Sequence, residues 1–226
     1  LPVELHIEHM DTKRHSADRL FGVLEDLYRR KYRDIRVDVV VACDESALSF
    51  VMARRGLFHD APVVFCGINN YRDDLIAGQT DITGVAEDFD LDGTLRVALE
   101  LHPGTRHVAI VTAATPTGQA TLKRARRAYG RFPQVDFVEL AHLTVESLED
   151  RLASLPANTV IIRTPFLRDA AGRIFSVAEG ARLVESFTDL PVYTMWEFSI
   201  GPETVGGIMT DGRLQIRARA VSDGLR

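Results

Sequence analysis

The stretch VVVACDESA, Val39 to Ala47, carries the pattern that decides the fold. A run of apolar and small residues leads directly into the acidic pair Asp44 and Glu45, and a helical pattern follows. A continuous β-branched run, in place of an alternating one, is typical of a strand in a parallel sheet that helices cover on both faces. The stretch therefore predicts a strand, a polar turn and a helix in succession.

The rest of the 226 residues repeats this unit. Strands are predicted at 3–10, 37–42, 62–66, 82–87, 107–112, 135–140, 159–163, 191–195 and 205–209. Helices are predicted at 16–32, 45–55, 93–101, 118–129, 145–154 and 177–187, with another from 213 onward. Alternation of this kind predicts the α/β class, with doubly wound parallel sheets.

One polar segment interrupts the alternation. Residues 69–92 are punctuated by glycine and carry no convincing helical pattern, as expected where a chain leaves one sheet and enters another. We therefore expect two Rossmann-like lobes. Lobe 1 consists of residues 1–85 together with about 200–226, and lobe 2 of residues 86–199.

The net charge and the length of the apolar runs limit the kinds of partner that this chain is expected to bind. The net charge of -5 argues against a nucleic-acid partner, because phosphate binding needs a basic face. No apolar run reaches the roughly 18 residues that span a bilayer, so membrane contact is expected only through segments outside this chain. The chain opens on Leu1-Pro2 without a signal-peptide pattern, which indicates a piece of a longer protein. Cys43 and Cys66 are expected to be buried free thiols.

Ligands of open parallel α/β sheets bind beyond the carboxyl ends of the strands. Acidic groups there suit an ammonium, the N–H groups of a helix start suit a carboxylate, and aromatic rings suit an apolar or cationic group. An amino-acid-like zwitterion is thus the expected ligand. The candidate ligand-binding residues are Asp44, Glu45, Asn69, Asn70, Glu87, Thr115, Thr117, Gly118, Phe166, Trp196, Glu197 and Phe198.

Simpler interpretations of these residues stay open. The acidic pair after Val39–Ala42 can serve only to complement a helix dipole, an effect of about 0.3–1 kcal/mol. Thr115 and Thr117 can act as helix caps, Trp196 can belong to the core, and Asn69-Asn70 can form a turn.

Several motifs fail on inspection. Asp88 to Gly93 matches the start of an EF-hand loop, but Leu99 stands where the bidentate Glu belongs. His6 and His9 point to opposite faces of a strand, which argues against zinc. The chain has no GxGxxG, GxxxxGK[ST] or GxSxG motif. We therefore predict no metal, cofactor or catalytic residue, with a hydrolase or glycosidase using Asp44, Glu45, Glu87 or Glu197 as the alternative.

Three stretches, 37–47, 62–70 and 82–87, resemble the extracytoplasmic sensor domains of bacterial histidine kinases and diguanylate cyclases. Those domains are similar to the substrate-binding proteins of ABC transporters in the tryptophan-binding-protein group. Further matching stretches are 4–14, 101–105, 115–118, 166–173 and 196–207. Together they span nearly the whole chain.

The resemblance implies a type I periplasmic-binding-protein fold that closes on a small solute, outside the cytoplasm and without catalysis. Solute held between the lobes would shift the population toward the closed state, and a receptor would pass that shift through the membrane. A substrate-binding protein of an ABC transporter is the alternative, and a homodimer stays open. Family members also carry a strand and helix before Leu1 and a linker after Arg226, so part of the site is expected to be missing here.

Overall fold

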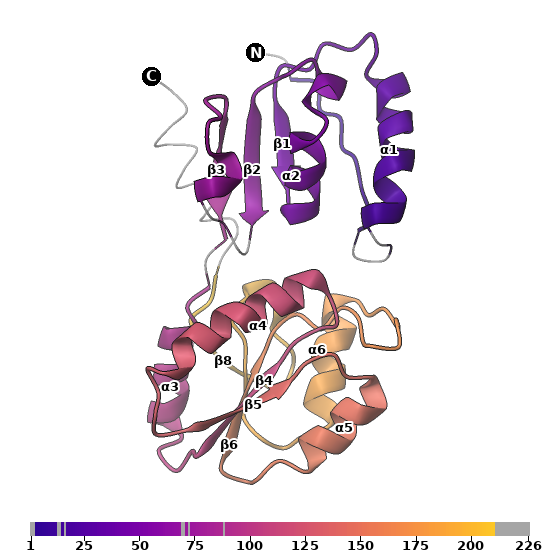
Figure 1. Ribbon diagram of the computed structural model, residues 1–226. Coiled ribbons are helices and arrows are strands. Elements are labelled where there is room, and N and C mark those ends of the chain that lie inside the picture. The colour runs from indigo at the N-terminus through magenta and orange to yellow at the C-terminus, as the bar shows by residue number, and fades with distance from the viewer. Residues whose placement is uncertain are drawn as a thin grey trace. The chain divides into compact units, whose positions relative to one another are not determined.

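The computed structural model describes residues 3–12, 15, 17–68, 71, 73–87 and 89–210. The chain divides into two compact units between Ala86 and Glu87. Both units are built from parallel strands and helices (Figure 1), as the sequence predicts. Each unit is described separately.

The first unit contains a three-stranded parallel sheet in the order β1–β2–β3. These strands are Val40–Cys43, Val63–Ile68 and Ile82–Ala86. The helices are α1 (Ala17–Lys31) and α2 (Glu45–Met52), and two short 3-10 helices, η1 (Arg55–Phe58) and η2 (Asp73–Ile76), lie in the connections. Strands β1 and β2 pair in regular register, so that Val40 faces Val63 and Cys43 faces Cys66.

The core of this unit lies on one face of its sheet and is rich in aromatic rings. Tyr28 of α1 makes edge contacts with Phe50 of α2 and with Tyr32, at centroid distances of 5.7 and 6.0 Å. Ala42 of β1 and Phe65 of β2 are buried in the same cluster. The alternate residues of β1, Val41 and Cys43, point to the other face and are exposed.

Two expectations for this unit are wrong. Cys43 is predicted to be buried, because helices cover both faces of a doubly wound sheet. It is instead exposed, since it lies on the outer face of β1. Residues 3–10 form no strand, since no strand of the described residues pairs with them, and an extended segment without a ladder partner is not a sheet member. Val3, Leu5 and Ile7 are accordingly exposed.

The second unit contains a five-stranded parallel sheet in the order β5–β4–β6–β7–β8. The strands are β4 (His107–Val111), β5 (Asp136–Leu140), β6 (Thr159–Arg163), β7 (Val192–Tyr193) and β8 (Thr204–Gly206). β6 is buried along its whole length, as a continuous Val-Ile-Ile run requires. Thus part of the segment expected in lobe 1 forms the edge strand of the second sheet.

Helices cover both faces of the second sheet. They are α3 (Leu91–Leu101), α4 (Pro116–Tyr129), α5 (Val145–Ala153) and α6 (Val177–Ser186). One core cluster joins α3 and α4 to Val108 and Ile110 of β4, and another joins α5 and α6 to Ala109 and Val111. The alternation of β4 side chains therefore confirms a doubly wound sheet in this unit.

The predicted helices begin and end close to the observed ones because their caps are correct. Thr115, Thr144 and Ser176 each accept a hydrogen bond from the backbone N–H three residues on. Helix α3 begins two residues earlier than predicted, since Asp90 caps it by accepting from Gly93 N at 2.7 Å. The helix expected from 213 onward lies outside the described residues.

A fully buried ion pair lies within the second unit. The guanidinium of Arg163, at the end of β6, is 3.4 Å from Glu185 Oε1 on α6, and both side chains are almost completely buried. Arg163 Nη2 also donates to Ser199 O at 2.5 Å, and burial lowers the pKa of Arg163. Among the helices that the structure describes, none is long and apolar enough to cross a membrane.

Candidate functional site

Asp44 occupies the carboxyl end of the first sheet and holds the start of α2. Its carboxylate accepts a hydrogen bond from Glu45 N at 2.7 Å, and its own N–H donates to Cys66 O at 2.9 Å. Asp44 is therefore the N-cap of α2, and Glu45 lies half-buried in the first turn of this helix. Both carboxylates are fixed to rigid elements at the predicted sheet edge.

The backbone of Asp44 is strained. Its φ of 81° and ψ of 156° fall in a region that glycine adopts almost exclusively. Holding another residue there costs about 1–3 kcal/mol, and such residues cluster at ligand sites. Asn69 and Asn70, predicted at the same edge, lie outside the described residues.

In the second unit, α4 begins at the carboxyl edge of the sheet. Thr115 Oγ1 accepts from Gly118 N at 3.0 Å, so Thr115 is a helix cap, and Thr117 lies half-buried in the first turn. Gly118 packs so closely that a Cβ added to it would lie 2.2 Å from Ala113 O. The residue type at 118 is thus explained by packing, and the N–H of Gly118 is used by the Thr115 cap.

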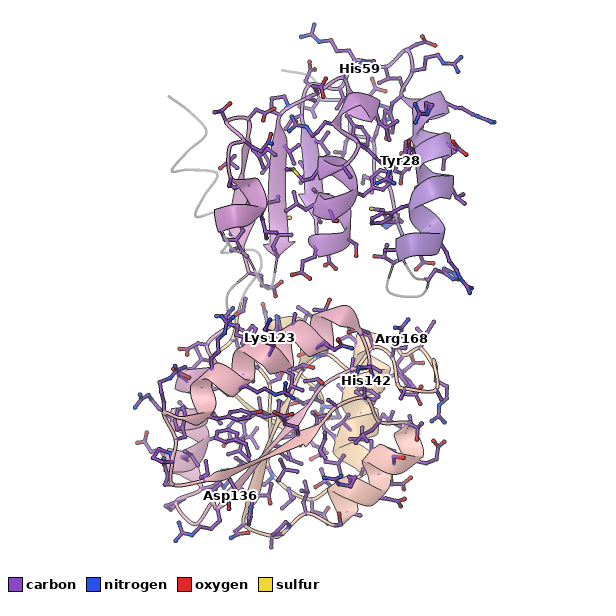
Figure 2. The ribbon with its side chains drawn as sticks, viewed as in Figure 1. Tyr28, His59, Lys123, Asp136, His142 and Arg168 are labelled. Atoms are coloured by element: carbon purple, nitrogen blue, oxygen red, sulfur yellow. The ribbon has the colours of Figure 1, made fainter. Side chains whose placement is uncertain are left out.

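Three polar residues that the sequence analysis did not single out lie beside this helix start. The guanidinium of Arg168 donates to Ala114 O from Nη2 at 3.1 Å and from Nε at 3.3 Å. Gln119 Nε2 and His142 Nε2 are 2.5 Å apart. Figure 2 labels Arg168 and His142 in this part of the unit. Both follow strands, after β6 and β5, which is the signal that could have identified them.

Two buried hydroxyl groups lie at the same carboxyl edge of the second sheet. Thr112 and Thr164 directly follow β4 and β6, which are neighbouring strands, and each is at most 3% exposed. Neither Oγ1 has a hydrogen-bond partner in the part of the chain that the structure describes. Both hydroxyl oxygens are enclosed by the protein, so they lie beneath the surface of this edge.

Trp196 lies beyond the end of β7, and the N–H of its indole ring is hydrogen-bonded. Its Nε1–H donates to Glu87 Oε1 at 2.5 Å, and its ring packs against Phe89 at a centroid distance of 5.1 Å. The side chain is buried in the core cluster of α3 and α4. The structure therefore brings two predicted site residues, Glu87 and Trp196, into direct contact.

The remaining predicted residues differ in accessibility. Phe166 is 1% exposed and packs with Val184 and Phe175 in the cluster under α5 and α6. Glu197 and Phe198, in the 3-10 helix η3 (Glu197–Ser199), are exposed. The sequence could not distinguish these cases, because all three residues simply follow strands.

A groove of about 980 Å³ lies at the opposite, amino edge of the second sheet. Its walls include His102, Thr159, Asp189 and Val192, which precede or begin β4, β6 and β7. Since ligands of parallel α/β sheets bind at the carboxyl edge, we do not assign the solute site to this groove. Among the described residues, no group of three His, Cys, Asp or Glu side chains is placed to hold a metal ion.

Comparison with known proteins identifies the fold. No family model matches the sequence, and no curated protein does. Among solved structures, a domain from Streptococcus pneumonia in complex with L-Trp has a TM-score of 0.60 at 15% identity, over 91% of this chain and 72% of that one. An open, ligand-free substrate-binding protein with adhesive properties from Clostridium difficile has a TM-score of 0.59 at 13% identity, over 91% and 70%. The chain therefore has the parallel α/β fold of type I periplasmic binding proteins.

Proposed function

We propose that this chain is a non-catalytic binding module for an amino-acid-like zwitterion and that it acts outside the cytoplasm as the sensor domain of a receptor. The observation that supports the ligand class is a difference in charge between the two sheet edges. Asp44 and Glu45 are carboxylates at the carboxyl edge of the first sheet, whereas the start of α4 and Arg168 are positive at that of the second. Negative and positive groups of this kind are those that recognise the ammonium and the carboxylate of a zwitterion.

The second unit is equipped to recognise a carboxylate. Arg168 is held at the edge by Ala114 O, and a guanidinium that keeps free N–H groups can bind a carboxylate. The start of α4 adds the positive end of a helix dipole at the same edge. The first unit supplies the charge for an ammonium, and the strain at Asp44 is consistent with a position selected for binding.

In the domains that the chain resembles, solute binding shifts the population toward a closed state. In a receptor, that shift would be passed on to a signalling domain. The sensor role is supported by the resemblance of 37–47, 62–70 and 82–87 to sensor domains. The likeness to a substrate-binding protein favours transport as the second candidate. The coding sequence after Arg226 distinguishes them: a membrane span followed by a kinase or cyclase domain means sensor.

The ligand class is tested by isothermal titration calorimetry with L-amino acids, aromatic carboxylates and neutral sugars. We expect an L-amino acid to bind, and Asp44→Asn, which keeps an oxygen for the cap but removes the charge, to weaken binding at least tenfold. Arg168→Gln should weaken it similarly. The matched controls are Asp136→Asn, at the amino end of β5, and Lys123→Gln, on the exposed face of α4 (Figure 2).

Binding of neutral sugars alone, or equal affinity in the Asp44→Asn and Asp136→Asn variants, would contradict the proposal. The catalytic alternative is tested by turnover assays of the native chain and of the Asp44→Asn and Glu197→Gln variants. Turnover of an ester or glycoside that Asp44→Asn or Glu197→Gln abolishes would identify a hydrolase in place of a binding module.

A further inference from the structure

The two cysteines of the chain face each other across neighbouring strands. Cys43 ends β1, and Cys66 lies in β2 as its in-register partner. Their Sγ atoms are 3.1 Å apart. The contact is long-range, since the residues are 23 positions apart, and Figure 1 shows β1 and β2 adjacent in the first unit.

The backbone already meets the requirements of a disulfide bond. In-register residues on neighbouring strands are separated by about 4.8 Å, inside the range of roughly 4.4–6.8 Å over which two Cα atoms can be bridged. Register also places both side chains on the same face of the sheet, as the sulfur contact demonstrates. Closing the bond requires side-chain rotation that brings the sulfurs about 1 Å closer.

The pair is also accessible to a reagent. Cys43 is exposed and Cys66 is half-buried, and they share the outer face of the sheet with the exposed Val41. A thiol must be reached by an oxidant before it reacts, so an exposed thiol next to a second one is the arrangement that thiol–disulfide exchange needs.

We propose that Cys43 and Cys66 form a reversible disulfide bond through exchange with a small disulfide such as oxidised glutathione. The Cys43 thiolate attacks one sulfur of the oxidant, forms a mixed disulfide and releases one thiol. The Cys66 thiolate then attacks Cys43 Sγ, closes the internal bond and releases the second thiol. Two protein thiols are oxidised, one disulfide is reduced, and both protons end on the released thiols.

This bond would connect the two strand ends from which the candidate ligand residues leave. Asp44 directly follows Cys43, and its N–H already donates to Cys66 O, so the covalent link would reinforce a hydrogen-bonded junction. The modification stands independently of the solute proposed above, because it depends only on the register of β1 and β2.

The test is oxidation of the full chain, in its native state, by a glutathione buffer of varied ratio. Free thiols are then counted under denaturing conditions, and intact mass is measured. We expect two thiols to fall to none, the mass to fall by about 2 Da for two lost hydrogens, and the chain to stay monomeric on a non-reducing gel. A peptide map should show the 43–66 link, and dithiothreitol should restore both thiols.

The same exchange repeated in concentrated urea is the matched control. Without the register of β1 and β2, we expect the ratio of oxidised glutathione needed for half-oxidation to rise at least tenfold. Cys43→Ser and Cys66→Ser should each leave one thiol that forms only a glutathione adduct. Two thiols that persist in the native chain, adducts on both cysteines, or disulfide-linked dimers would each overturn the inference.

Discussion

The indole N–H of Trp196 donates a hydrogen bond to a carboxylate oxygen of Glu87, 109 positions earlier in the chain. Glu87 is the first residue of the second unit, and Trp196 follows the short strand β7. The bond therefore connects the first residue of the second unit to the segment that follows its strand β7. Because Trp196 is the chain's one tryptophan, its fluorescence reports on this contact directly.

We predict that Glu87→Ala lowers the free energy of unfolding by about 1–3 kcal/mol, because it leaves the buried indole N–H without its acceptor. Urea unfolding followed by tryptophan fluorescence measures the loss. Glu197→Ala removes an exposed carboxylate next to Trp196 and should change stability by no more than about 0.5 kcal/mol. Equal losses in the two variants would show that the Glu87 contact does not stabilise the unit.

The buried pair gives a second prediction. Arg163→Met leaves Glu185 buried without its charged partner, which should cost about 3–5 kcal/mol. The double variant Arg163→Met, Glu185→Leu removes both charges, so its loss should be smaller than that of Arg163→Met alone. A double-mutant cycle by urea unfolding measures this coupling. Additive losses would mean that the two charges do not interact.

Stability in acid should depend on Arg173. Hydrogen bonds from its guanidinium, at 2.6 and 2.7 Å, lower the pKa of Glu146 to about 2 from its usual 4.5. Burial raises the pKa of Asp169, but hydrogen bonds from the backbone and side chain of Arg173 outweigh it and hold that pKa below normal. Both folded-state values are depressed, so the stabilisation is complete above pH 4.5 and is lost as the pH falls toward 2.

We therefore expect the unfolding free energy of the native sequence to fall more steeply between pH 4.5 and 2 than that of Arg173→Ala. Circular dichroism during urea unfolding at a series of pH values gives both slopes. Parallel slopes would show that the Arg173 guanidinium does not lower the pKa of either carboxylate.

Close packing at the start of α4 gives a prediction about glycine. A Cβ at position 118 would lie 2.2 Å from Ala113 O, so Gly118→Ala should cost about 1–3 kcal/mol of stability. Gly130, at the end of the same helix, has a helical φ of -62° and open space around its Cα. Gly130→Ala should therefore stabilise the protein by about 0.4–1 kcal/mol. Thermal unfolding of the two variants tests the contrast, and a neutral Gly118→Ala would refute the packing argument.

The sequence predicts the second unit better than the first, and the reason is physical. Continuous Val-Ile runs such as 159–163 and strong caps such as Ser176 are local signals, and the structure confirms both. Residues 3–10 also read as a strand locally, but a strand exists only with a ladder partner, which a local pattern cannot supply. The predicted burial of Cys43 is wrong for a similar reason. Whether other elements cover the outer face of a strand depends on the tertiary structure, which a local pattern cannot supply.

The candidate site was predicted by position and not by accessibility. The rule that ligands bind beyond strand ends selected Asp44, Thr115 and Trp196, which the structure places at those ends. It could not tell that Phe166 turns into the core or that Arg168 is held at the edge by Ala114 O. Those outcomes depend on which way a loop residue points, and this is decided by packing partners far away in the sequence.

The outer face of β1 has a practical consequence for handling the protein. Val39 and Val41 are 50% and 59% exposed, so this side of the first unit offers aliphatic surface to water. Such surface gains free energy when it is removed from solvent, and sulfate strengthens that gain. This area should accordingly contribute to self-association: ammonium sulfate would promote clustering of chains, and a lysine in place of Val41 would raise the concentration at which precipitation begins.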